Sequence, residues 1–237
     1  MQTGLKLKSY SNRVLASLPI LEMGQLAPYL LPVDLPRHLT LHEPGQDVDT
    51  VFFPEAGICS IVAAMEDGIT IEVGIIGRDG FVGTPAILGA DHSPNRCFMQ
   101  IPGHGFKMKA KILIEQAGAS GPLRLSLLRS VQALIVQTAQ TAACNRVHEL
   151  HERLARWLLM CSDRVQSDRL SITHEFLATM LGTRRSSVTV AAATLQKTGL
   201  ISHARGHVTI ENRAGLVDAA CECYTVVHKE YVRLGLL

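Results

Sequence analysis

The chain has 237 residues, of which 47% are hydrophobic, and a formal net charge of +2. This length suits two modest domains or one large one, and the apolar content excludes wholesale disorder. The net charge of the whole chain says nothing about a nucleic-acid partner, but the distribution of charge does. Residues 1–143 contain 11 Lys and Arg against 12 Asp and Glu, whereas residues 144–237 contain 12 against 9, so the positive excess lies in the second part of the chain.

Features that the sequence lacks constrain its compartment. No apolar run reaches the roughly 18–20 residues that a membrane helix needs, and the N-terminus lacks the apolar core of a signal peptide. We therefore expect a cytoplasmic protein with no membrane partner. The cysteines are expected to be reduced and mostly buried, because they are scattered without CxxC pairs or metal-type clusters. The six are Cys59, Cys97, Cys144, Cys161, Cys221 and Cys223.

Residues 5–30 have the apolar spacing of a short helical lead-in, and the pattern changes at about Val33. From there, short apolar or alternating runs are separated by glycine-containing turns at intervals of roughly 11–12 residues. Regular short strands with this spacing predict an antiparallel, jelly-roll-like β-roll over residues 33–110. The turns are Glu43-Pro44-Gly45, Glu55-Ala56-Gly57, Glu66-Asp67-Gly68 and Arg78-Asp79-Gly80.

From Leu123 to about Asp163 the period is helical, without Pro or Gly, which predicts one helix roughly 60 Å long. A small domain needs a shorter helix to cover its own core. We therefore expect this helix to join two domains and to pair with its copy in a dimer. Thr138 and Asn145 are polar residues within the predicted seam. They would either fix the register in which the two helices pair or suit a helix whose register changes. The alternative is an intramolecular core helix with a break. The seam residues, spaced as in a two-stranded coiled coil, are Leu128, Val131, Ile135, Thr138, Ala142 and Asn145.

Residues 173–210 have the pattern of two short helices around a tight turn, followed by a hairpin. The first helix ends at Gly182, which suits a left-handed turn, and Thr183 is the expected N-cap of the second helix. The second helix ends in a basic turn closed by a glycine. Two short strands then flank residues 202–207, with Arg205 at the tip. This order predicts a winged helix-turn-helix.

The charge of this segment is one-sided. Residues 176–210 contain no Asp or Glu but four Lys and Arg side chains. A DNA surface repels carboxylates and rewards Lys and Arg through counterion release, so we expect this segment to bind DNA. The alternative is an ordinary helical hairpin with a solvated basic edge. The predicted buried face of the second helix is Val188, Ala191, Ala192 and Leu195.

The tail, residues 213–234, has the spacing of one more helix and contains a C-x-C pair at Cys221 and Cys223. Positions i and i+2 of a helix point roughly 200° apart, so the two sulfurs are not expected to share a metal ion. No metal site is predicted. His148 and His151 are i, i+3 neighbours on the long helix and are expected to face solvent.

The order of β-roll, long helix and winged helix-turn-helix resembles the Crp/Fnr superfamily of bacterial transcription regulators over nearly the whole chain. The strongest match is ITHEFLATMLGTRRSSVTVAAATLQKTGLI, which shares the family residues Gly182, Val188, Leu195, Gly199, Leu200 and Ile201.

The resemblance implies an α+β fold with three parts: a cyclic-nucleotide-binding-like sensor over residues 1–120, a long dimerisation helix over 121–162 and a winged helix-turn-helix domain over 163–237. It implies a homodimer that binds a pseudo-palindromic site in double-stranded DNA, with RNA polymerase as a further partner.

In the family, the first turns of the recognition helix contact bases and phosphates. Arg185 matches a family arginine and is expected to bind guanine through two hydrogen bonds. Ser186 replaces the acidic residue that stands beside this arginine in the family, and Val190 replaces a further family arginine. The chain is therefore not expected to read the best-known DNA half-site of the family. The predicted DNA-binding residues are Thr183, Arg184, Arg185, Ser186, Ser187, Thr189, Lys197 and Arg205.

In cyclic-nucleotide members, a Gly-Glu pair holds the ribose and an Arg-Ser pair holds the cyclic phosphate. The segment GFVGTPAILGADHSPNRCFMQ resembles that cassette, but Thr84 replaces the glutamate, which can accept two hydroxyl bonds, and Cys97 replaces the serine. Arg96 is expected either to bind another anion or to pair with a carboxylate such as Glu72 or Asp91. The effector is a cyclic nucleotide, another small anion, or none. The implied effector residues are Gly83, Thr84, Arg96, Cys97 and Thr138.

Other sensors and functions lack support in the sequence. An iron–sulfur centre would need a cysteine cluster before Cys59, and none is present. Paired carboxylates, a Gly-rich phosphate loop and a Ser/Cys–His arrangement are absent at usable spacing, so no enzyme is predicted. The remaining rival to a transcription regulator is a ligand-binding or scaffold module without DNA activity.

Overall fold

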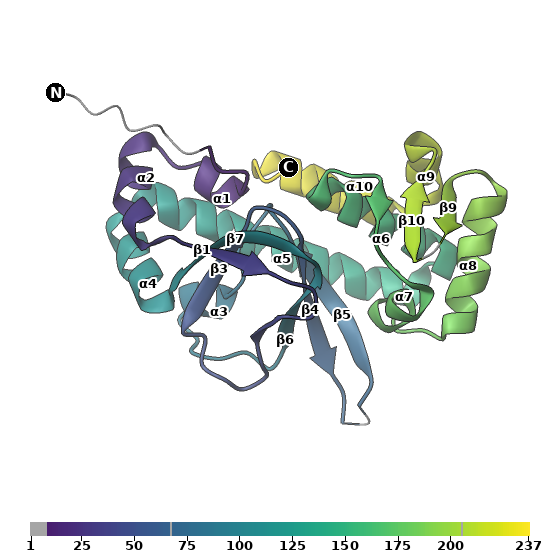
Figure 1. The fold of residues 1–237 in the computed structure, drawn as a ribbon, viewed down its shortest axis with the longest axis horizontal. Helices are drawn as coiled ribbons and strands as arrows, with labels where there is room; N and C mark the ends of the chain where they lie inside the picture. The colour runs from purple at the N-terminus through teal and green to yellow at the C-terminus, as the bar shows by residue number, and fades with distance from the viewer. Residues whose placement is uncertain (1–8, 67, 205) are drawn as a thin grey trace.

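The computed structural model describes residues 9–66, 68–204 and 206–237, so the predicted wing-tip residue Arg205 lies outside the described residues. The described chain forms an elongated α+β molecule, with the β-roll toward one end and the helix-turn-helix at the other (Figure 1). Within these ranges, none of the helices is both long enough and apolar enough to span a membrane.

The N-terminal part contains the predicted β-roll. Its two antiparallel sheets have the strand orders β1-β7-β3 and β2-β6-β4-β5. One apolar cluster joins Leu35 of the first sheet to Cys59, Ile76 and Met99 of the second, as expected for sheets packed face to face. The elements are α1 (Arg13–Ala16), α2 (Ile20–Leu26), the short 3-10 helix η1 (Ala27–Tyr29), β1 (Leu31–Leu35), β2 (Thr40–His42), β3 (Thr50–Pro54), β4 (Ile58–Ala64), β5 (Thr70–Ile76), α3 (Thr84–Ile87), β6 (Arg96–Ile101), β7 (Gly103–Lys109) and α4 (Ala110–Ala119).

The helix predicted to run unbroken from Leu123 to about Asp163 is two helices, α5 (Gly121–Val147) and α6 (Leu150–Val165). Between them, Glu149 has extended dihedrals, with φ −72° and ψ 157°. Its carboxylate accepts from the backbone N–H of Glu152, whose side chain accepts from the N–H of Glu149 at 2.8 Å. This capping box starts a new helix. The expectation of one continuous helix was therefore wrong, and the break that belonged to the alternative is present.

The predicted seam of α5 is exposed except at one position. Val131 is buried in a core with α1, α4 and the first sheet, so it faces its own domain and not a partner. Leu128 and Ile135 are 43% and 56% exposed. We call the remaining residues the exposed stripe of α5; they are Leu128, Ile135, Thr138, Ala142 and Asn145.

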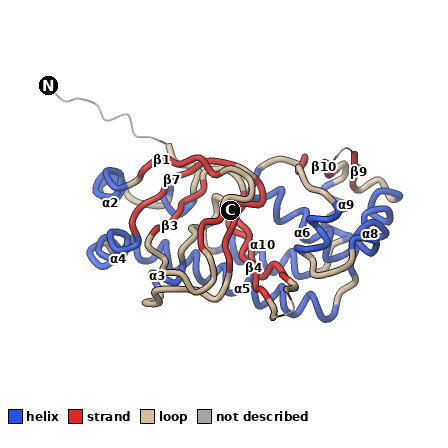
Figure 2. The backbone as a smooth tube through the Cα atoms, turned by 60° about the horizontal axis from the view of Figure 1, so that its bottom comes forward, coloured by secondary structure: helices blue, strands red, loops and turns tan. Residues whose placement is uncertain are grey.

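The C-terminal part has the predicted winged helix-turn-helix arrangement. The wing strands β9 and β10 pair with each other, and β8 adds to β10. Figure 2 shows β9, β10 and α8 at the end of the molecule opposite α2 and α4. The elements are β8 (Arg169–Leu170), α7 (His174–Met180), α8 (Arg185–Lys197), β9 (Ile201–Ala204), β10 (His207–Ile210), α9 (Arg213–Ala219) and α10 (Glu222–Arg233).

Two expectations for this part need correction. The tail predicted as one helix is two, α9 and α10, because the backbone is extended at Ala220 and Cys221. Thr183 is not the N-cap of α8; Arg184 holds that position with extended dihedrals and makes no side-chain capping bond. The left-handed Gly182, with φ +60°, is as predicted.

The helix-turn-helix part packs directly on the hairpin formed by β4 and β5. Trp157 of α6 donates from Nε1 to Oε1 of Glu72 on β5 at 2.6 Å, and Ser60 of β4 donates to the other carboxylate oxygen. Arg164, near the end of α6, forms a 2.7 Å ion pair with Asp79, which follows β5. One apolar cluster continues from β4 and β5 into α6, α7 and α8. The two parts of the chain therefore share a core.

The Glu72 carboxyl gives this contact a pH dependence. Burial raises the pKa of Glu72 to about 7, although bonds from Ser60 and Trp157 oppose the shift. Between the unfolded pKa of about 4.3 and the folded value, the folded chain binds a proton that the unfolded chain has lost. The free energy of unfolding should therefore fall, by up to about 3 kcal/mol, as the pH rises from 5 to 8.

We predict that Glu72→Gln removes most of this pH dependence, because the amide oxygen still accepts from Trp157 but carries no charge. Urea unfolding at pH 5 and pH 8 measures it. The exposed Glu115→Gln is the matched control and should keep the wild-type difference. An equal pH dependence in all three proteins would contradict the prediction.

Candidate functional site

The tight turn between α7 and α8 holds one face of α8 outward. Gly182 closes the turn in a left-handed conformation, and the N–H of Thr183 donates to the carbonyl of Ala178 at 2.9 Å. The inward face of α8 is buried at all four predicted positions, Val188, Ala191, Ala192 and Leu195. Its opposite face is thereby left free at the surface.

The predicted DNA-binding residues that the structure describes lie on this outward face. Six of the seven lie between Thr183 and Thr189, around the first turn of α8, and Lys197 lies at its C-terminal end. The N-cap residue Arg184 makes no side-chain bond to the N–H groups of the first turn of α8, and uncapped N–H groups at a helix start bind phosphate well. The exposed residues are Arg184, Arg185, Ser186, Thr189 and Lys197, and the half-buried ones are Thr183 and Ser187.

A pair of histidines, not singled out by the sequence, connects this face to the wing. The rings of His174 on α7 and His203 on β9 stack with centroids 4.1 Å apart. Nδ1 of His174 lies 3.2 Å from the hydroxyl of Thr189, which itself donates to the carbonyl of Arg185 at 3.0 Å. Thr189 therefore has partners within the protein and helps to fix α7, α8 and the wing relative to one another.

Four of the five implied effector residues line one cavity between the β-roll and α5. These are Gly83, Thr84, Cys97 and Thr138, and the volume is about 140 Å³. Most of the remaining wall is apolar, with Val48, Ile61, Val73, Ile76, Val82 and Leu134. This volume is below the roughly 300 Å³ at which typical ligand pockets begin.

Arg96 does not line this cavity. Its Nη2 donates to the hydroxyl of Thr40 at 2.7 Å, and its Nε lies 3.4 Å from Oε1 of Glu43. The guanidinium also lies over the ring of Phe98, 5.5 Å from its centroid. The expectation that Arg96 pairs with Glu72 or Asp91 was wrong. Glu72 is bound by Ser60 and Trp157, and Asp91 is bound by His92. Of the two expected roles for Arg96, anion binding or pairing with a carboxylate, the structure shows the pairing, with Glu43.

The cavity accordingly has no fixed charge among its described lining residues. Its one titratable group besides Cys97 is His42, and burial lowers the pKa of that imidazole below its usual value. A cyclic phosphate would enter here without an arginine to neutralise it. The lining suits a small, uncharged and largely apolar ligand better than an anion.

The expectation that the sulfurs of Cys221 and Cys223 point apart as positions i and i+2 of one helix was wrong. Cys221 is the extended N-cap of α10, and Cys223 is the second residue of that helix, so the helical angle between i and i+2 does not separate them. His148 also differs from expectation, because it lies in the break after α5 with its Nδ1 3.5 Å from the sulfur of Cys223.

Known proteins share the fold described above, a β-roll followed by a helix-turn-helix part. Residues 152–219 match the Crp-like helix-turn-helix domain family. A global nitrogen regulator from Nostoc sp. is 23% identical over 185 residues, which is 73% of this chain and 82% of the relative.

Solved structures extend the likeness to most of the chain. FixK2 from Bradyrhizobium japonicum superposes with a TM-score of 0.70 at 13% identity, covering 81% of this chain and 98% of the other. The c-di-GMP-responsive global regulator CLP from Xanthomonas campestris gives 0.67 at 16% identity, covering 82% and 100%.

The cavity wall at Gly83 yields a stability prediction. Its φ is +108°, and a Cβ there would lie 2.8 Å from Cγ1 of Val51. We expect Gly83→Ala to lower the free energy of unfolding by about 2–4 kcal/mol, through both backbone strain and overpacking.

The matched control for this change is Gly89→Ala, where φ is +79° but no atom lies within 4 Å. It should cost only about 1–2 kcal/mol, from the left-handed backbone alone. Chemical denaturation measures both variants, and equal losses would contradict the steric part of the argument.

Proposed function

We propose that this chain, a Crp/Fnr-type transcription regulator with a DNA-binding helix-turn-helix, binds double-stranded DNA as a homodimer and reads each half of a pseudo-palindromic site with the N-terminal turns of α8. The domains are those of the family, with the boundary placed at residues 148–149. That break is favoured over residue 163 because α6 shares its core with α7 and α8, and all but its first two residues belong to the matched helix-turn-helix family segment.

The observation that carries this proposal is the outward face of α8. It offers two arginines, hydroxyl side chains and backbone N–H groups that the N-cap side chain does not bind, and residues 176–210 contain no carboxylate. Arg185 can donate two hydrogen bonds to guanine, while Arg184 and Lys197 are suited to contacts with DNA phosphates. A scaffold module without DNA activity would not need this concentration of donors on one exposed face.

Dimerisation is supported by the exposed stripe of α5. Leu128 and Ile135 are large apolar side chains that remain largely exposed along one face of this helix, at the spacing of a coiled-coil seam. Pairing of two copies along α5 would cover them. It would also place two α8 helices in one assembly, as a two-fold symmetric DNA site requires.

The effector is proposed to be a small, uncharged ligand of the cavity, because Thr138 and Leu134 of α5 form part of the cavity wall and such a ligand would touch the dimer helix directly. The alternatives are a cyclic nucleotide and no effector at all. A thermal-shift panel of cyclic nucleotides and small neutral compounds separates the three. We also place the protein in the cytoplasm, with RNA polymerase as a further partner.

We predict that Arg185→Glu weakens binding to a selected genomic operator by about 1–3 kcal/mol per half-site and lowers the salt dependence of binding, since a contact and a positive charge are lost. Fluorescence anisotropy at several salt concentrations measures both effects. The matched control Lys111→Glu makes the same charge change on α4 and should bind like wild type. Equal losses in both variants would indicate a net-charge effect and contradict this placement.

We predict that Ile135→Lys shifts the chain from dimer toward monomer, because pairing along α5 would bury and desolvate the new charge. Sedimentation equilibrium measures the dissociation constant. Ile114→Lys, on the exposed surface of α4 at 47% exposure, is the matched control and should leave the dimer intact. A wild-type chain that is monomeric at micromolar concentration would contradict the homodimer itself.

A further inference from the structure

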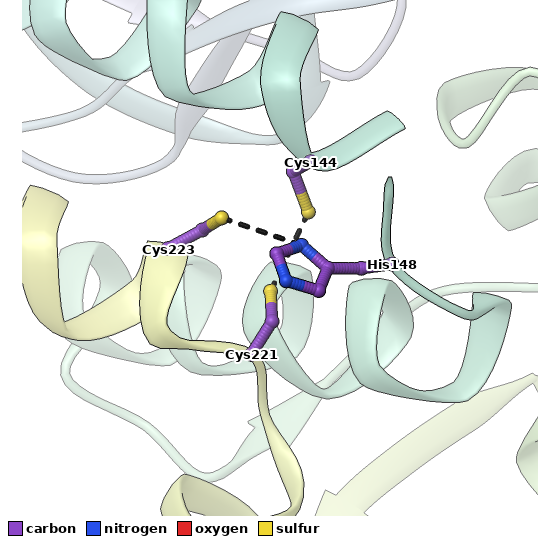
Figure 3. Close-up of side chains that lie close together, drawn as sticks. All are labelled: Cys144, His148, Cys221 and Cys223. Carbon is purple, nitrogen blue, oxygen red and sulfur yellow. Dashed lines mark hydrogen bonds between the residues drawn. The ribbon is translucent and has the colours of Figure 1, made fainter. Parts of the chain in front are cut away.

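Four side chains from distant parts of the sequence converge where the end of α5 meets the start of α10. Cys144 comes from the last turn of α5, His148 from the break after it, and Cys221 and Cys223 from the start of α10 (Figure 3). Their potential ligand atoms all lie within 4.8 Å of one another. The sulfurs of Cys144 and Cys221 are 3.4 Å apart, and the sulfur of Cys223 is 3.5 Å from Nδ1 of His148.

These distances fit the edges of a metal-centred tetrahedron. With Zn–S near 2.3 Å and Zn–N near 2.0–2.1 Å, tetrahedral geometry puts sulfur atoms roughly 3.8 Å apart and sulfur and nitrogen roughly 3.5 Å apart. Three cysteines and one histidine are a ligand set found in structural zinc sites. We propose that Cys144, His148, Cys221 and Cys223 bind a zinc ion in a closed structural site.

The surrounding groups are those that a thiolate-rich zinc site needs. Nε2 of His148 lies 3.1 Å from Oε2 of Glu222, which orients the ring so that Nδ1 points into the cluster. The amide Nε2 of Gln140 donates to the sulfur of Cys223 at 3.2 Å. Both contacts support a ligand in its deprotonated, metal-binding form.

Charge also favours the ion. Three thiolates and a divalent cation leave one net negative charge. Arg156 is 3% exposed and acts electrostatically on Cys144. Among the described residues it donates to Thr141 and to the sulfur of Met160 but has no carboxylate within ion-pair distance. An anionic zinc site beside Arg156 compensates this buried positive charge.

The site would add metal bonds between three segments that already meet through packing and a few polar contacts. It fixes the end of α5, the break that leads into α6, and the N-terminus of α10. Because this break connects the dimer helix to the helix-turn-helix domain, the ion stabilises one orientation of α6 relative to α5. This role is structural and does not depend on which DNA sequence or effector the chain binds.

The test is the metal content of the full chain, purified without chelator under reducing conditions and measured by inductively coupled plasma mass spectrometry. We expect about one zinc ion per chain in the wild type. Cys59→Ala, which removes a buried thiol of β4 outside the cluster, is the matched control and keeps its zinc. Zinc is lost in the variants Cys144→Ser, His148→Ala, Cys221→Ser and Cys223→Ser.

A second measurement needs no ligand variant to fold. CoCl₂ added to metal-free wild-type chain should give the visible bands of tetrahedral cobalt bound by thiolates, and ZnCl₂ should displace it. Glu222→Gln should weaken zinc binding about tenfold while keeping the same cobalt spectrum, since it changes only the orientation of His148. A chelator should lower the melting temperature of wild type and of Cys59→Ala.

Two outcomes would overturn the proposal. One is a chain with neither zinc nor a tetrahedral cobalt spectrum. The other is a disulfide between Cys144 and Cys221 in place of the metal, identified by peptide mass mapping of the purified chain.

Discussion

Arg164 is a fully buried guanidinium at the point where the β-roll, α5, α6 and α10 meet. It pairs with Asp79 at 2.7 Å, and both side chains are 1% exposed. It also donates to Gln137 on α5 and stacks over the ring of Tyr231 on α10, 5.0 Å from its centroid. Loss of one partner of such a pair leaves an uncompensated charge, which costs about 3–5 kcal/mol. The position of the helix-turn-helix domain depends on this interaction.

Gln137 connects that ion pair to the cavity between the β-roll and α5. Its amide donates to the carbonyl of Ile75 on β5 at 3.0 Å and its oxygen accepts from Arg164 at 3.3 Å. The next residue, Thr138, lines the cavity. A ligand that displaces α5 by even a fraction of an ångström would therefore act on a buried, closely packed polar network. Such networks have few alternative arrangements, which is the physical requirement for a switch between discrete states.

The chemistry of the cavity differs from that of a cyclic-nucleotide site in a consistent way. The substitutions at Thr84 and Cys97 remove a carboxylate and a hydroxyl, and Arg96 is turned toward Glu43 outside the cavity. The changes together leave a largely apolar wall whose polar groups are uncharged hydroxyl and amide side chains and His42, the pKa of which is lowered by burial. The β-roll is thus present without the charges in its cavity that would bind a phosphate.

The sequence by itself determined the parts whose signals are local. The apolar spacing, Gly182 and the absence of carboxylates predicted the helix-turn-helix, and glycine turns predicted the β-roll, because both depend on neighbours within a few residues. It could not predict the breaks at Glu149 and Cys221, where an unusual N-cap and extended backbone replace any Pro or Gly signal. Only the tertiary structure decided which distant side chains meet, as with the Cys144 and Cys221 sulfurs, since long-range packing sets such contacts.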